Sequence, residues 1–229
     1  DRRLIDVLNE ENVMRRLATR IVTSGEHKIN IAAAKPAASW IEEGGALTFG
    51  DAKFDQKILD AHKLHVAIKV TEELLYDNAF NLEDYIIVQF GKALANAEED
   101  AFLNGNGTGK PTGIFDGTGG GHLLNTLTAA LKSDDMLDLV YGLKRPYRKK
   151  AAFIMNDATM PSLRKLKDNN GAYIWQPAYQ AGEPDRILGY KVETSGYAPK
   201  DGISFGDYSY YNIGDRGSRS FKQLNELFA

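Results

Sequence analysis

The stretch LNGNGTGKPTGIF, residues 103–115, combines closely spaced glycines with a lysine and has the composition of a phosphate-binding loop. A P-loop needs a glycine, four residues and then Gly-Lys-Ser/Thr, placed between a strand and a helix so that backbone N–H groups surround the phosphate. Here Pro111 follows Gly109 and Lys110, and Asn104 stands where the first glycine belongs. A helical pattern also precedes the stretch in place of a strand. We therefore predict a helix-exit turn, made by Gly105, Gly107, Gly109 and Pro111.

The chain has few residues that could bind a metal or act as a nucleophile. There are no cysteines, which excludes disulfides and thiolate sites, and the four histidines are His27, His62, His65 and His122. His62 and His65 are three residues apart at the start of a predicted strand, so they would point to opposite faces and could not share a metal. No HExxH or GxSxG motif is present, and Ser195 is interpreted as a turn residue. We expect no enzyme activity, no metal and no cofactor.

Charged residues form several clusters that need a function or a structural explanation. The acidic clusters Glu42-Glu43, Glu72-Glu73 and Glu98-Glu99-Asp100 could include a glycosidase pair, but adjacent acids most often form a solvated face, which is the interpretation adopted here. The basic block Arg145, Arg148, Lys149 and Lys150 is a possible contact patch for nucleic acid or an acidic neighbour, and the alternative is a solvated loop.

Length, composition and charge limit the classes of protein to which this chain can belong. The chain has 229 residues, 43% hydrophobic and 26% charged, which is typical of a soluble protein of one large domain or two small ones. No apolar run of membrane-spanning length and no export leader is visible. The formal charge of −3 disfavours a general nucleic-acid binder, because phosphate contacts require a basic face.

Hydrophobic periodicity predicts the elements of the first half. A helix is expected up to Ile21, a strand over 27–31, and two arms of a long hairpin over 32–62. Clean alternation predicts a half-buried strand over 63–70. A long helix is predicted over 81–103, with an apolar stripe at Leu82, Tyr85, Ile86, Phe90, Ala93, Leu94, Ala97 and Ala101.

The second half alternates shorter elements. A helix is predicted with Ser133 as its cap, then a buried strand over 151–156, a helix from Asp157, and strands separated by turns in the tail. This order predicts an α+β or α/β subdomain. The two hairpin arms, of about 20 residues each, would reach roughly 65 Å if extended. Unless the arms fold back, part of the hairpin must project and needs a neighbour to lie on.

Several segments, in this order, resemble the major capsid proteins of tailed bacteriophages and prophages, the Hong Kong 97-like fold family. They are LHVAIKVTEELL, AFLNGNGTGKPTGIF, FIMNDATMPSLRKLKDNNGAYIW, GEPDRILGYKVETS and FGDYSYYNIGDRGSRSF. The resemblance covers nearly the whole chain, and we expect the family's scaffold-like N-terminal region and its last peripheral strand to be missing from it.

The resemblance implies an α+β fold with five parts. These are an N-terminal arm and helix over 1–27, an extended loop hairpin over 28–71, a peripheral domain with a spine helix over 72–122, an axial domain over 123–201, and returning peripheral strands over 202–229. The loop would lie over an adjacent subunit, and its candidate contact residues are Trp40, Phe49, Phe54, Glu42 and Glu43.

The function implied is that of a structural subunit. It would self-assemble through pentamers and hexamers into an icosahedral shell around phage DNA, with scaffold or protease and portal as assembly partners. DNA contact would be weak and non-specific, without membrane or small-molecule substrate. The protein would be in the virion capsid and assemble in the bacterial host cytoplasm. The alternatives are an encapsulin-like compartment subunit, an enzyme or nucleotide-binding protein, and a nucleic-acid-binding domain.

Overall fold

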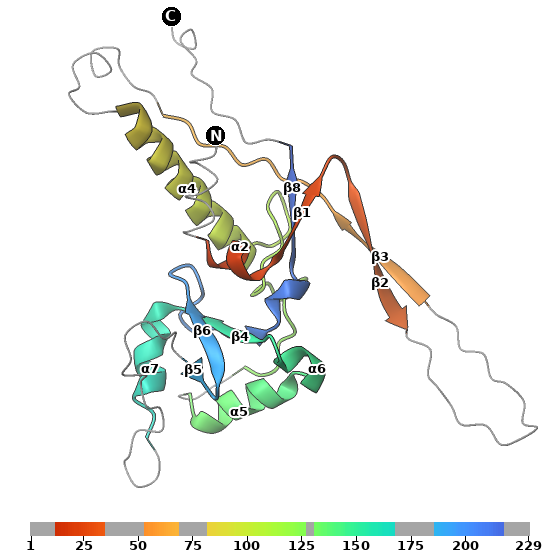
Figure 1. The fold of residues 1–229 in the computed structure, drawn as a ribbon. Coiled ribbons are helices and arrows are strands. Elements are labelled where there is room, and N and C mark those ends of the chain that lie inside the picture. Colours follow the sequence, from red (N-terminus) through yellow and green to blue (C-terminus); the bar gives the residue numbers. More distant parts are fainter. Residues whose placement is uncertain (1–11, 35–52, 69–81, 127–130, 168–185, 218–229) are drawn as a thin grey trace, which may run out of the picture. The chain divides into compact units, whose positions relative to one another are not determined.

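The computed structural model describes residues 12–34, 53–68, 82–126, 131–167 and 186–217. The chain divides into two units. Unit 1 comprises Asp1–Thr19, His62–Ile213 and Arg219–Ala229, and unit 2 comprises Arg20–Ala61 and Gly214–Ser218. Unit 1 combines helices with a sheet (Figure 1), which agrees with the predicted mixture of α and β structure.

The longest helix of the described residues is α4, which spans Leu82–Asn104 and confirms the long helix predicted from the sequence. Its buried positions follow a step of four residues, which is close to the helical repeat. The positions on this stripe are Ile87, Gly91, Ala95, Glu99 and Leu103, and Phe102 beside it is also buried.

The buried stripe of α4 differs from the predicted one, since Tyr85, Ala93 and Ala97 are exposed. Small residues on the true stripe let another segment approach closely, and the Asn12 side-chain amide donates a hydrogen bond of 3.4 Å to the carbonyl oxygen of Ala95. The prediction followed the larger apolar side chains and therefore selected a neighbouring face.

A four-stranded sheet in the order β5-β6-β4-β7 lies at the centre of unit 1. Its strands are β4 Ala152–Met155, β5 Arg186–Ile187, β6 Tyr190–Thr194 and β7 Ile203–Gly206. β4 runs parallel to β6 and antiparallel to β7. All four residues of β4 are buried, which confirms the predicted buried strand. β7 begins just after residue 202, the expected boundary, and pairs with β4.

Short helices complete unit 1. They are α2 Val13–Leu17, α5 Ser133–Gly142, α6 Arg145–Arg148, η1 Asp157–Thr159, α7 Met160–Arg164 and η2 Tyr208–Tyr210. α5 begins at Ser133, but Lys132 occupies the cap position and its backbone N–H donates to the Asp135 carboxylate over 2.7 Å. The helix predicted from Asp157 begins as η1, with the Asn156 side chain as its cap.

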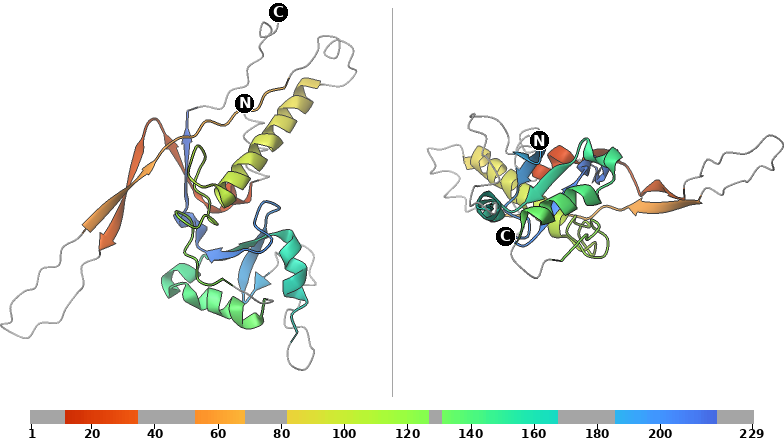
Figure 2. Two further views of the ribbon diagram at one scale, coloured as in Figure 1. Left: turned by 180° about the vertical axis from the view of Figure 1, so that it is seen from behind. Right: turned by 90° about the horizontal axis from the view of Figure 1, so that it is seen from below.

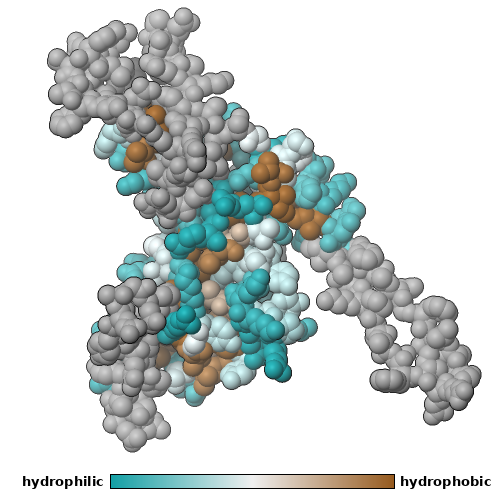
Figure 3. All heavy atoms as spheres, in the orientation of Figure 1, coloured by the Kyte–Doolittle hydropathy of each residue, from teal (hydrophilic) through white to brown (hydrophobic). Residues whose placement is uncertain are grey.

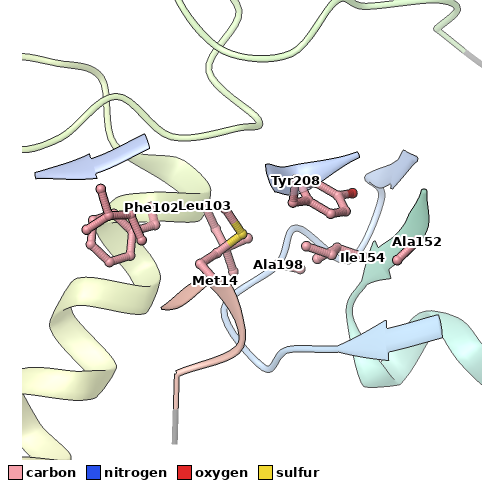
Figure 4. Packing of buried hydrophobic residues seen from close by; sticks show 8 residues of the cluster. Met14, Phe102, Leu103, Ala152, Ile154, Ala198 and Tyr208 are labelled. Carbon is pink, nitrogen blue, oxygen red and sulfur yellow. The ribbon is translucent and has the colours of Figure 1, made fainter. Parts of the chain in front are cut away.

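The two faces of the sheet contact different helices, because successive side chains of a strand point to opposite sides. Phe153 and Met155 of β4 pack with α5 and α7, and Figure 2 shows these two helices on the side of the sheet away from α4. Ala152 and Ile154 pack with α2, the last turn of α4 and η2 (Figure 4).

The helix predicted up to Ile21 is wrong at its end. α2 stops at Leu17, Ala18 is extended, and strand β1 follows over Thr19–Thr23. β1 pairs with β8, which spans Asn212–Arg216. β-Branched residues fill most of β1 and favour a strand once a partner is available.

Unit 2 contains a two-stranded antiparallel ribbon of β2 His27–Ala34 and β3 Lys53–Leu59. His27 lies opposite Leu59, and the register shifts between Ala32 and Ala34. This pairing confirms the two arms of the predicted hairpin in the described residues.

The strand predicted over 63–70 is wrong for residues 63–68, which form no ladder, and residues 69 and 70 lie outside the described part. The alternating residues Leu64 and Ile68 are 47% and 60% exposed. Alternation specifies an apolar face for an extended segment, but a strand also needs a backbone partner, and this segment has none among the described residues.

Candidate functional site

The glycine-rich loop after α4 folds back onto the end of that helix. The backbone N–H groups of Ile114 and Phe115 donate to the carbonyl oxygens of Phe102 and Leu103, each over 2.9 Å. The Gly113 N–H donates to the Gly105 carbonyl oxygen over 2.7 Å. The last carbonyls of a helix lack partners within the helix, so the loop supplies them.

Glycine is required where the loop touches the helix. A Cβ on Gly105 would lie 1.9 Å from the Pro111 carbonyl oxygen, and a Cβ on Gly113 would lie 2.4 Å from the Leu103 carbonyl oxygen. Gly107 and Gly109 have positive φ angles of 73° and 69°, which favour glycine. The structure thus places the four predicted turn residues, Pro111 included, in one reversal at the end of α4.

The direction of the N–H groups argues against phosphate binding. A phosphate loop directs backbone donors at a ligand, whereas here Gly113, Ile114 and Phe115 donate to carbonyl groups of the chain. Lys110 is exposed in the reversal.

Tyr211 holds the loop to the segment before β8. Its hydroxyl donates to the Thr112 carbonyl oxygen over 2.6 Å, and its ring packs edge-on against Phe102 at a centroid distance of 6.1 Å. Burial raises the pKa of Tyr211 to about 12. Tyr211 was not among the site residues predicted from the sequence.

The acidic cluster at the end of α4 was predicted to form a solvated face, and this prediction is wrong for Glu99. Glu99 is only 3% exposed, and its Oε2 accepts a hydrogen bond of 3.1 Å from the backbone N–H of Met14 in the first turn of α2. Asn12, which is fully buried, caps the same turn by accepting from the Arg15 N–H over 2.9 Å. Glu99 therefore provides a carboxylate to the start of a helix, where negative charge is favourable.

Burial raises the pKa of Glu99 above its ordinary value, and the Met14 N–H, the Ser195 hydroxyl and Arg16 partly oppose this effect. The second oxygen, Oε1, is buried and makes no hydrogen bond with the described residues. Ser195 itself lies in the predicted turn, where its carbonyl oxygen accepts from Ala198.

Three ion pairs lie around α2. The Arg15 Nε atom lies 2.6 Å from Oε2 of Glu98, and the Arg15 side chain is only 3% exposed. Arg16 reaches Oε2 of Glu193 on β6 over 2.7 Å, and Lys191 pairs with the other oxygen of Glu193. Ion pairs therefore link α2 both to α4 and to the sheet. The step-of-four pattern of Gly91 and Ala95 was the sequence signal that could have placed Glu99 inside.

The basic block contains one structural residue and three exposed ones. Arg148 donates from Nε to the Leu143 carbonyl oxygen over 2.6 Å and from its terminal nitrogen to the Tyr141 carbonyl oxygen over 2.9 Å. It thus caps the C-terminal end of α5, which is a structural role in addition to the predicted contact. Arg145, Lys149 and Lys150 are exposed.

The other candidate residues are not brought together. The four histidines are exposed at separate positions, and no group of metal-binding side chains was found among the described residues. No helix in the described part of the chain has the length and apolar character needed to cross a membrane. Trp40, Phe49, Glu42 and Glu43 lie outside the described residues, as does the side chain of Phe54, and so does the acidic pair Glu72-Glu73.

Known proteins resemble this chain in sequence. The sequence model of the phage capsid family matches residues 1–229. The major capsid protein of Klebsiella oxytoca phage phiKO2 is 22% identical over 234 residues, which cover 94% of this chain and 54% of the relative. The chain thus spans about half the length of this curated relative.

Solved structures are similar in fold. A structure described as the capsid of a native GTA particle, computed with C5 symmetry, has a TM-score of 0.82 and 28% identity, and covers 94% of this chain and 80% of that one. A chain of Microbacterium phage Oxtober96 has a TM-score of 0.68 and 18% identity over 90% of this chain and 73% of its own, which is a likeness of fold alone. Since the family match extends over every residue, the chain belongs to the phage capsid family.

Proposed function

We propose that the chain is a structural subunit of major capsid type, which self-assembles through pentamers and hexamers into an icosahedral shell around DNA. The family match over residues 1–229 is the observation that carries the proposal. Similarity to the GTA capsid, with a TM-score of 0.82, supports it. In this role the chain acts by repeated contacts between copies and needs neither a cofactor nor a substrate.

The ribbon of unit 2 supports an assembly role. A two-stranded ribbon is marginally stable alone in water, so it benefits from a surface to lie on. Val22 and Ile58 of unit 2 are 86% and 57% exposed, and hydrophobic atoms reach the surface of its strands in Figure 3. We assign residues 28–71 to an extended loop that contacts an adjacent subunit, with Trp40, Phe49, Phe54, Glu42 and Glu43 as contact residues.

The remaining parts receive roles by the same proposal. Residues 1–27 would form the N-terminal arm and helix, 72–122 the peripheral domain, 123–201 the axial domain around the symmetry axes, and 202–229 the return to the peripheral domain. Scaffold or protease and portal would act during assembly in the host cytoplasm, and the finished subunit would belong to the virion.

Negative-stain electron microscopy of the full-length gene product, expressed with any scaffold or protease partner, tests this function. Closed uniform shells that contain nuclease-protected DNA are expected. A full-length protein that stays monomeric under these conditions would contradict the assembly role. Shells that enclose a protein cargo in place of DNA would favour a compartment subunit.

A further inference from the structure

The outer face of α5 carries apolar and charged side chains, and their arrangement makes this surface complementary to the same surface on a second copy of the chain. Asp134, Leu137, Asp138 and Tyr141 are spaced at i, i+3, i+4 and i+7 and so share one side of the helix. The opposite side carries the buried Met136 and Val140, which pack against the sheet. We call the four outward residues the α5 face.

The centre of the α5 face is apolar and exposed. Leu137 is 39% and Tyr141 is 67% exposed. Leu124, which is 44% exposed, lies beside the end of α5, because its side chain is 3.0 Å from where a Cβ on Gly142 would be. Grouped exposed apolar side chains with a polar surround are typical of protein contact surfaces.

Tyr141 is held in place before any partner arrives. The Arg148 guanidinium lies over its ring at 4.8 Å from the centroid, while the same group donates to the Tyr141 and Leu143 carbonyl oxygens. An aromatic side chain fixed in this way loses little conformational freedom on binding, and tyrosine is enriched among residues that dominate contacts.

The two ends of the α5 face have opposite charge. Asp134 and Asp138 are exposed at and beyond the start of the helix, and Lys144 and Arg145 are exposed just after its end. None of these four side chains makes an ion pair within the described part of the chain. One end of this surface is therefore the electrostatic complement of the other end on a second molecule.

We propose that the α5 face, with its basic end at Lys144 and Arg145, is a contact surface between copies of this chain, in which the acidic end of one copy meets the basic end of the next. The exposed acids repel phosphate groups, which disfavours a nucleic acid or an anionic membrane as the occupant. The inference deepens the proposed function, since it names one surface through which shell subunits would meet.

Charge reversal with complementation tests this contact. Variant A is Asp134→Lys/Asp138→Lys, and variant B is Lys144→Glu/Arg145→Glu. Each alone places like charges opposite each other and should weaken self-association in sedimentation velocity at least about tenfold. An equimolar mixture of A and B pairs opposite charges again and should regain association close to that of the unmodified chain. Restoration by mixing also shows that both variants are folded.

A matched control reverses charges at the two ends of the helical segment formed by η1 and α7. Asp157 and Lys165 are exposed at the start of η1 and the end of α7, and Asp157→Lys/Lys165→Glu should leave association unchanged. Tyr141→Ser should weaken association to a similar extent as A or B, because it removes the apolar centre.

The outcomes separate this inference from the proposed function. If A and B each associate and form shells like the unmodified chain, the α5 contact is refuted and the shell function stands. An unmodified chain that remains monomeric at every concentration, or a variant B that loses only retention on DNA, also overturns the contact. If the unmodified full-length protein forms no shells while the α5-dependent association persists, the shell function fails and the contact stands.

Discussion

Replacing Gly113 by alanine should detach the glycine-rich loop from the end of α4. The added Cβ would lie 2.4 Å from the Leu103 carbonyl oxygen, 2.5 Å from its carbonyl carbon and 2.6 Å from the Asn104 nitrogen. Real Cβ contacts essentially never fall below 3.0 Å, and all three atoms are backbone. Leu103 is fully buried, so the helix end cannot yield easily.

The expected cost follows from the hydrogen bonds that the displaced loop would lose. Those from Gly113, Ile114 and Phe115 to helix-end carbonyls measure 2.7 Å, 2.9 Å and 2.9 Å. Each contributes about 0.5–1.5 kcal/mol net, and alanine returns about 0.4–1 kcal/mol by restricting the unfolded chain. We therefore expect Gly113→Ala to lower the free energy of unfolding by about 2–3 kcal/mol.

Urea unfolding followed by far-UV circular dichroism measures this change. Gly117→Ala is the matched control in the same region, because a Cβ there meets nothing within 4 Å. The control should be neutral or stabilising by up to about 1 kcal/mol. Hydrogen exchange adds a local readout, since the Ile114 and Phe115 amides should lose protection only in Gly113→Ala. Equal stability of the two variants, with both amides still protected, would refute the reasoning.

Three further substitutions test the buried contacts of Glu99, Arg15 and Tyr211. Glu99 has a raised pKa in the folded protein, so stability is greatest below the unfolded value of 4.5 and falls as pH rises towards the folded pKa. Glu99→Gln should abolish this part of the fall in the free energy of unfolding as pH rises above 4.5, measured by urea unfolding at a series of pH values, and an unchanged pH profile would count against burial of the charge. Arg15→Ala should cost about 3 kcal/mol or more in thermal unfolding, because it leaves Glu98 without its buried partner; a loss below about 1 kcal/mol would indicate a solvated pair. Tyr211→Phe should cost about 1 kcal/mol for the lost bond to Thr112 and remove a tyrosine that titrates near 12 by absorbance.

The regular elements of this chain were largely predictable because their signals are local. The period of α4 extends over many turns, and the run of β4 is short, apolar and bounded by polar residues. The loop after α4 was predictable as a turn, since asparagine and glycine favour helix ends. Its hydrogen bonds to Phe102 and Leu103 were not, because the direction of N–H groups depends on how the chain returns.

Features that depend on distant partners were not predictable. The segment 63–68 has the alternation of a strand but lacks a ladder, and Leu64 remains exposed. β1 was assigned to a helix because its partner β8 is far along the chain. In both cases the residue pattern specifies a face, and the pairing partner decides whether a strand forms.

Glu99 illustrates why side-chain chemistry cannot be assigned from composition alone. An acid among acids at the end of a helix is expected to face water, yet this one is buried where α2 begins. The N-terminal N–H groups of α2 need acceptors, and a five-residue helix has few other means of satisfying them. Glu99 supplies one acceptor from α4, and Asn12 supplies another from the residue before α2. The burial cost of the carboxylate is thus tied to the presence of α2, so the two segments should order or separate together.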